Sequence, residues 1–135
     1  MRPYRLIGSI VSLLVFAGLL GCGGKTTTMC KITAFSVSPA SATVSHTAAP
    51  PANAQHFDAF QTAAPAGCAF ALGNLTTATW TVSDTVNVSI GATSSDSAFG
   101  TATCKNATAG AVTVTATVPV GDGTNLSNTA SLTCN

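Results

Sequence analysis

Apolar and hydroxyl-bearing residues alternate one by one along several segments of this chain, and this pattern limits the folds that it can adopt. In the segment 77–83 every second residue is apolar and the others are threonine or serine, and the segment 112–118 repeats the pattern. Successive side chains of a β-strand point to opposite faces, so each segment has one apolar and one polar face. No eleven-residue window has the apolar stripe of an amphipathic helix. The sequence therefore predicts an all-β protein.

Seven short strands follow from this pattern and from the turn residues between them. The predicted strands are 31–38 with a short continuation at 42–44, 55–61, 77–83, 86–90, 99–104, 112–118 and 129–134. Ile32 is out of phase with the rest of its segment, which predicts a bulge there, and Pro39 predicts a break. We expect a glycine-rich hairpin loop over 120–125. Short strands with this spacing are typical of a β-sandwich of two sheets.

The N-terminal segment 1–21 has the order of a secretory signal peptide. Arg2 and Arg5 precede an uncharged apolar run over 6–20, and a small residue and Cys22 follow. A basic segment, an apolar segment and a small-residue cleavage site in this order predict export and removal of the leader. The alternative is a retained transmembrane helix, because the uncharged run approaches the roughly 20 residues that span a bilayer.

Residues 19–22, Leu-Leu-Gly-Cys, resemble the lipobox of bacterial lipoproteins. The resemblance implies cleavage before Cys22 and acylation of its thiol and its new amino group, which would attach the chain to a membrane. The polar residues 22–29 would then form a flexible, lipid-anchored tether for a single domain over 30–135. Gly23 follows the cysteine, and by the sorting pattern of that family it favours the outer membrane in a cell that has one.

The chain after the predicted leader carries little charge. It has three lysines, four aspartates, no arginine and no glutamate, which gives a net charge of −1. Nucleic-acid binding requires a clustered basic face, and three scattered lysines do not form one. We therefore expect no nucleic-acid partner.

Three motifs within 30–135 resemble bacterial Ig-like group 2 domains. Ile-Thr-Ala-Phe-Ser-Val-Ser-Pro at 32–39 is similar to their opening strand, Thr-Trp-Thr-Val-Ser-Asp at 79–84 to their tryptophan strand, and Ala-Gly-Ala-Val-Thr-Val-Thr-Ala at 109–116 to their penultimate strand. The resemblance implies a single immunoglobulin-like β-sandwich with Trp80 against the opposite sheet. It also implies a non-enzymatic protein of the cell envelope, engaged in adhesion, recognition or scaffolding, with a protein or glycan partner at the cell surface.

Four cysteines remain when Cys22 is assigned to the lipid. They are Cys30, Cys68, Cys104 and Cys134. An even number in an exported chain predicts disulfides, whereas zinc sites use closely spaced cysteine pairs that this chain lacks. In an Ig-like strand order the first strand starts where the second ends, and the fifth and seventh strands end at the opposite pole. From that order we hypothesise the pairs Cys30–Cys68 and Cys104–Cys134, one of three connectivities.

His56 and Asp58 form the acid–imidazole pair that the sequence offers for chemistry. They lie two residues apart on a predicted strand, on the face opposite Phe57 and Ala59. Two solvated side chains on the outside of a sheet explain this placement, and nothing nearby supplies an oxyanion hole or a pocket. The alternative hypothesis is a small periplasmic hydrolase or metal-binding protein that uses His56 and Asp58.

The sequence offers three further, weak candidates for metal ligands besides His56, namely His46, Asp122 and Asn125. His46 and His56 bracket a proline-containing loop, but a third ligand is not evident in the sequence. Asp122 and Asn125 could offer oxygen atoms to calcium, although hairpin turn chemistry explains the glycines beside Asp122 equally well. We therefore predict a protein that is not an enzyme and has no cofactor and no assigned metal site, and calcium binding at the Asp122 loop stays open.

Overall fold

The computed structural model describes residues 30–69 and 73–135, which contain nine strands and no helix. The strands are β1 (Ala34–Ser38), β2 (Ser41–Val44), β3 (Ala54–His56), β4 (Asp58–Ala63), β5 (Thr79–Val82), β6 (Val88–Ile90), β7 (Thr101–Cys104), β8 (Val112–Pro119) and β9 (Asn125–Cys134). The predicted all-β class is therefore confirmed. Nothing in these two ranges is a helix that could span a membrane. The predicted leader, Cys22 and the tether 22–29 lie outside the described residues.

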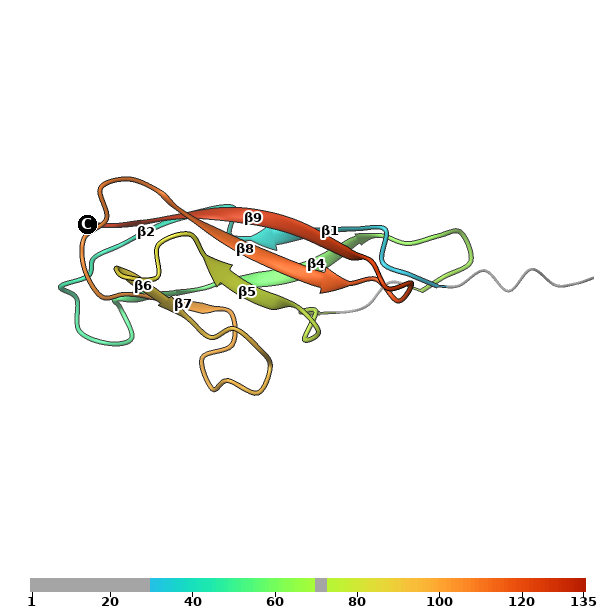
Figure 1. The fold of residues 1–135 in the computed structure, drawn as a ribbon, viewed down its shortest axis with the longest axis horizontal. Helices are drawn as coiled ribbons and strands as arrows, with labels where there is room; N and C mark the ends of the chain where they lie inside the picture. The colour runs from blue at the N-terminus through green and yellow to red at the C-terminus, as the bar shows by residue number, and fades with distance from the viewer. Residues whose placement is uncertain (1–29, 70–72) are drawn as a thin grey trace, which may run out of the picture.

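The strands form two layers of an elongated body (Figure 1). One layer is a four-stranded sheet in the order β2-β9-β8-β5. The other layer consists of the pair β1-β4 and the three-stranded sheet β3-β7-β6. Only Phe57 separates β3 from β4, and its N–H donates to the carbonyl of Gly100 at 2.8 Å. The two short strands are thus one bent segment that joins the two sheets of this layer.

The first strand segment changes layers at Pro39. Before this residue β1 pairs antiparallel with β4, and after it β2 pairs parallel with β9. Proline has no N–H and cannot continue a ladder, so a change of partner is favoured here. The irregularity expected at Ile32 lies slightly later, between Ala34 and Phe35.

The core lies between the layers and follows the alternation in the sequence. Trp80 is 1% exposed, and its ring packs against Phe57 and Phe99 with centroid distances of 6.5 and 6.4 Å. Val114 and Leu132 from β8 and β9 are fully buried beside them. Burial of each such side chain contributes about 1.5–3 kcal/mol relative to exposure. The core therefore comes from the apolar faces that the period-two pattern predicts.

Two predictions about the strands need correction. The expected seven strands become nine, because Pro39 and Phe57 each divide a predicted strand between two partners. The predicted strand 86–90 starts two residues too early, since Val86 is 75% exposed and β6 begins only at Val88. The cause is a turn at Asp84, whose carboxylate accepts hydrogen bonds from following backbone N–H groups.

The two disulfides lie at opposite ends of the body. Cys30 bonds to Cys68 with a Cα–Cα distance of 5.3 Å, and Cys104 bonds to Cys134 at 5.8 Å. These are the pairs hypothesised from the strand order. Cys30 is exposed, whereas Cys104 and Cys134 are each 1% exposed and belong to the core. One disulfide therefore closes a surface loop and the other is part of the packed interior.

Candidate functional site

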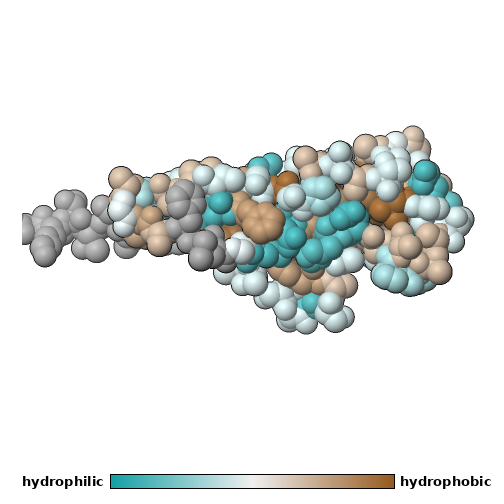
Figure 2. Space-filling model, turned by 180° about the vertical axis from the view of Figure 1, so that it is seen from behind, coloured by the Kyte–Doolittle hydropathy of each residue, from teal (hydrophilic) through white to brown (hydrophobic). Residues whose placement is uncertain are grey.

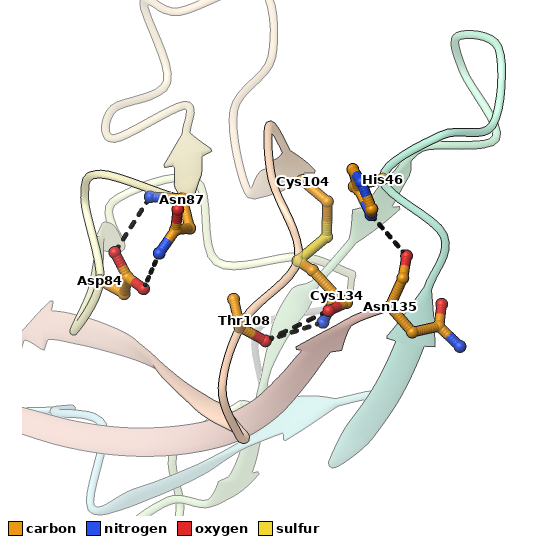
Figure 3. The surroundings of a disulfide bond; sticks show 7 residues. All are labelled: His46, Asp84, Asn87, Cys104, Thr108, Cys134 and Asn135. Atoms are coloured by element: carbon orange, nitrogen blue, oxygen red, sulfur yellow. Dashed lines mark hydrogen bonds between the residues drawn. A yellow bond between two sulfur atoms is a disulfide. The ribbon is translucent and has the colours of Figure 1, made fainter.

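The end of the molecule opposite Cys30, here called the distal pole, is formed by the loops 45–53, 84–87 and 105–111. Figure 3 shows the Cys104–Cys134 disulfide at its centre, with loop residues bonded to the end of β9. Thr108 donates its N–H to the Cys134 carbonyl at 2.8 Å, and its hydroxyl accepts the Cys134 N–H at 3.1 Å. These bonds hold the loop 105–111 against the disulfide-linked end of β9, so the loop has a fixed position at the distal pole.

His46 belongs to the distal pole and is already engaged there. Its N–H donates to the Asn135 carbonyl at 2.9 Å, and its Nδ1 lies 2.7 Å from the same oxygen (Figure 3). The structure places His56 elsewhere, on the outer face of the β3-β7-β6 sheet. The two histidines that bracket the proline-containing loop thus make separate contacts rather than one site.

The turn 84–87 projects an apolar side chain from the distal pole. Asp84 accepts the N–H of Val86 at 3.1 Å and that of Asn87 at 3.0 Å, and it accepts the Asn87 side-chain amide at 2.7 Å (Figure 3). Hydrogen bonds from the Asn87 backbone and side chain lower the pKa of Asp84, with a smaller contribution from the charge of Lys105. Lys105 also donates to the Thr85 carbonyl at 3.0 Å. The exposed Val86 thus stands on a turn that several hydrogen bonds hold.

A groove lies next to this turn, between the open edges of the two layers. It encloses about 460 Å³ and is lined by Trp80, Thr81, Val82, Thr85, Val88, Ser89 and Ile90. β5 is the last strand of one sheet and β6 the last strand of another. Trp80 and Val88 are buried there, while Val82 and Ile90 are half-buried. At one end of the groove the backbone N–H of Trp80 donates to the Ala92 carbonyl at 2.9 Å, so part of the β5 edge is covered.

The predicted pair of His56 and Asp58 is brought together and gains a third member. His56 Nε2 lies 3.0 Å from Asp58 Oδ1, and His56 Nδ1 lies 2.9 Å from Thr101 Oγ1. Thr101 is the register partner of His56 on β7. Local sequence gives no signal for this third residue, because the pairing of β3 with β7 joins distant parts of the chain. Figure 2 views the molecule from behind and shows hydrophilic residues gathered along the middle of the face that it presents.

The order carboxylate, imidazole and hydroxyl is that of a nucleophilic triad, so its surroundings decide what it can do. Thr101 lines a hollow of about 350 Å³ beside the loop 92–98, which projects from the body (Figure 1). Acyl transfer also needs free N–H groups for an oxyanion. The N–H of Gly100 donates to Gly91, and that of Thr101 donates to Ala98. These two donors are occupied, and the His56 side chain links β3 to β4 through Asp58 and to β7 through Thr101.

Asp122 lies at the end of the molecule that carries Cys30. Its carboxylate is bonded to other residues of the same chain. The Thr124 hydroxyl donates to its carboxylate, and Lys31 forms an ion pair with it at 3.0 Å. These hydrogen bonds, that of Thr124 first, lower the pKa of Asp122 strongly. Within 30–69 and 73–135, no three His, Cys, Asp or Glu side chains are placed to hold a metal ion. The Asp122 loop is thus arranged around an ammonium group and a hydroxyl.

The fold and the distal pole together define a small, disulfide-linked all-β sandwich domain. Comparison of the chain with protein-family models, with curated proteins and with solved structures finds no match.

Proposed function

We propose that this chain is a lipid-anchored protein of the bacterial cell envelope, whose immunoglobulin-like domain recognises a protein or glycan partner without catalysing a reaction. The lipid would be carried by Cys22 after removal of residues 1–21, and residues 22–29 would link it to the domain. The order of basic residues, apolar run, Leu-Leu-Gly and cysteine supports this anchor. Gly23 supports the outer membrane as the location in a cell that has one.

The strand order is the observation that carries the Ig-like part of the proposal. An immunoglobulin-type sandwich has its strands in one sheet of order A-B-E-D and another of order C-F-G. The order β1, β4 with β3, β7 and β6 corresponds to the first sheet, and β5, β8 and β9 correspond to the second. The buried Trp80 on β5 then occupies the strand that carries the central tryptophan of such domains. Because sandwiches of this kind host many functions, the recognition role rests on the surface rather than on the fold.

The polarity of the domain supports recognition at the distal pole. The described chain begins, next to the proposed tether, at one end of the elongated body, and the loops 45–53, 84–87 and 105–111 lie at the other end (Figure 1). Loops on a rigid scaffold are the usual carriers of binding residues. An anchor at Cys22 would therefore present the distal pole away from the membrane.

Metabolic labelling with a radioactive fatty acid tests the anchor. We expect the wild-type protein to be labelled and the Cys22→Ser variant to be unlabelled and larger by the length of the leader. A Cys30→Ala/Cys68→Ala variant is the matched control, because it removes two other cysteines and should keep the label. Label that persists in Cys22→Ser, or a precursor of unchanged size in both proteins, would contradict the lipid anchor.

Crosslinking on intact cells tests recognition. A photoreactive residue at position 107, in a loop of the distal pole, is expected to capture partners. The same residue at position 61 on β4 is the matched control and should capture fewer. Equal capture at both positions would argue against recognition through the distal pole.

A further inference from the structure

We infer that the groove between β5 and β6 receives the exposed Val86 of a second copy of this chain. The inference names a partner for the recognition domain and rests on the function proposed above. Two copies would meet through the same patch, the turn 84–87 and the adjacent groove, related by a two-fold axis. Such an isologous contact requires that the patch be complementary to itself.

The patch contains both an apolar projection and an apolar hollow. Val86 is 75% exposed and Phe60 is 37% exposed, and these are the large hydrophobic side chains that the described residues leave in solvent. The groove beside Val86 offers Val82, Val88 and Ile90 as apolar walls. A valine that enters it would remove apolar surface from water on both copies, which is favourable in proportion to the area.

One charged side chain of each sign flanks the patch, so a two-fold axis can bring opposite charges of two copies together. No charged side chain lines the groove. Asp84 and Lys105 flank the turn, close enough for the lysine to lower the pKa of the aspartate. A patch with one charge of each sign can place the carboxylate of one copy near the ammonium group of the other. Such an arrangement favours a second copy over a strongly charged partner.

The strand edges beside the groove are protected from pairing with another chain by their shortness alone. Exposed edge strands commonly carry lysine, proline or a bulge that prevents pairing with another chain. β5 has the sequence Thr-Trp-Thr-Val and β6 has Val-Ser-Ile, with none of these features. The Ala92 carbonyl covers β5 at Trp80. The open length that remains is short, so the side chain of Val86 rather than a long added strand would make the contact.

The size of the patch determines the strength of the association. Stable interfaces bury about 1,600 Å² in total, and one valine with one short groove per copy provides much less. We therefore expect weak pairing of the isolated domain. Attachment of many copies to one membrane raises their effective concentration, so that a weak contact becomes populated.

Concentration-dependent methyl NMR of the proposed mature chain, residues 22–135 with Cys22→Ser and both disulfides formed, tests the inference. The methyl signals of Val82, Val86, Val88 and Ile90 are expected to shift together as the concentration rises. Val86→Asp should raise the dissociation constant at least about tenfold, and Val86→Thr, which keeps the shape, should also weaken pairing. Phe60→Ser is the matched control, because it removes the other exposed hydrophobic side chain and should leave the concentration dependence unchanged.

Two outcomes would overturn the second copy as the partner. The first is a set of groove signals that stays constant with concentration. The second is an equal concentration dependence in wild type and in both Val86 variants. Neither outcome depends on acylation of Cys22, since this residue is serine throughout. Failure of the self-association and failure of the lipid anchor are therefore distinguishable.

Discussion

Removal of the two disulfides should have unequal effects on stability, in an order that chain entropy alone does not give. The bonded cysteines are 38 residues apart in Cys30–Cys68 and 30 residues apart in Cys104–Cys134. Loop closure then stabilises by about 3.9 kcal/mol for the Cys30–Cys68 bond and about 3.6 kcal/mol for the Cys104–Cys134 bond. The longer loop should therefore matter slightly more if entropy were the whole effect.

Burial reverses this order. Cys104 and Cys134 are each 1% exposed, whereas Cys30 is exposed. Replacement of the buried pair by alanine removes two packed sulfur atoms and adds about 1.5 kcal/mol for lost burial and the resulting cavity. We expect a loss of about 5 kcal/mol for Cys104→Ala/Cys134→Ala and about 4 kcal/mol for Cys30→Ala/Cys68→Ala.

Urea unfolding followed by tryptophan fluorescence measures both losses. Trp80 is the single tryptophan of the chain and is buried, so its emission reports exposure of the core. The total stability of a domain is about 5–15 kcal/mol, so the variant without the buried bond should unfold at a much lower urea concentration. Equal losses, or a larger loss for Cys30→Ala/Cys68→Ala, would refute the contribution of the buried sulfur atoms.

Three further predictions concern the core, a turn and a carboxylate. Trp80→Phe should lower the free energy of unfolding by about 1–2 kcal/mol in urea melts, and Trp80→Ala should lower it by about 3–5 kcal/mol. The loss for phenylalanine is small because the indole Nε1 has no hydrogen-bond partner among the described residues, so that no bond is lost. Equal losses for the two variants would contradict this reasoning. Gly100 has φ of +68°, and an added Cβ would lie 2.5 Å from a backbone oxygen, so Gly100→Ala should cost about 2–4 kcal/mol in thermal unfolding. Gly110→Ala meets open space and should change stability by less than about 0.5 kcal/mol. The hydrogen bond from Thr124 lowers the pKa of Asp122 below its ordinary 3.8, so its contribution is present above pH 3.8 and is lost as the pH falls below that value. Asp122→Asn should therefore lose less stability than wild type between pH 6 and pH 2.5, and parallel losses would show that this carboxylate contributes nothing.

The sequence predicts the inward faces of this domain well where the alternation is regular. In β8 and in the last five residues of β9, 130–134, every second residue is apolar, so the buried positions follow from the pattern alone. Val86 breaks this rule, because the hydrogen bonds of Asp84 rather than hydrophobicity decide where β6 begins. The division at Phe57 is equally hidden, since its cause is a bond to Gly100 far along the chain.

The candidate site is less predictable than the fold for a related reason. Its parts come from strand edges and loops that only the tertiary arrangement brings together. The groove needs β5 and β6 to be the last strands of different sheets, and Thr101 meets His56 only through the β3–β7 register. Neither relation has a local signature, whereas the cysteine pairs could be hypothesised because strand ends alternate between the two poles.

The placement of the disulfides at opposite ends of the body has a mechanical consequence. The strands β8 and β9 run along the long axis (Figure 1). A pull between Cys30 and the end of β9 would load the parallel β2–β9 ladder in shear, so that its hydrogen bonds would have to break together. The Cys30–Cys68 crosslink would carry tension directly to the segment after β4 and spare the β1–β4 ladder. We therefore expect the domain to resist extension when its two ends are pulled apart.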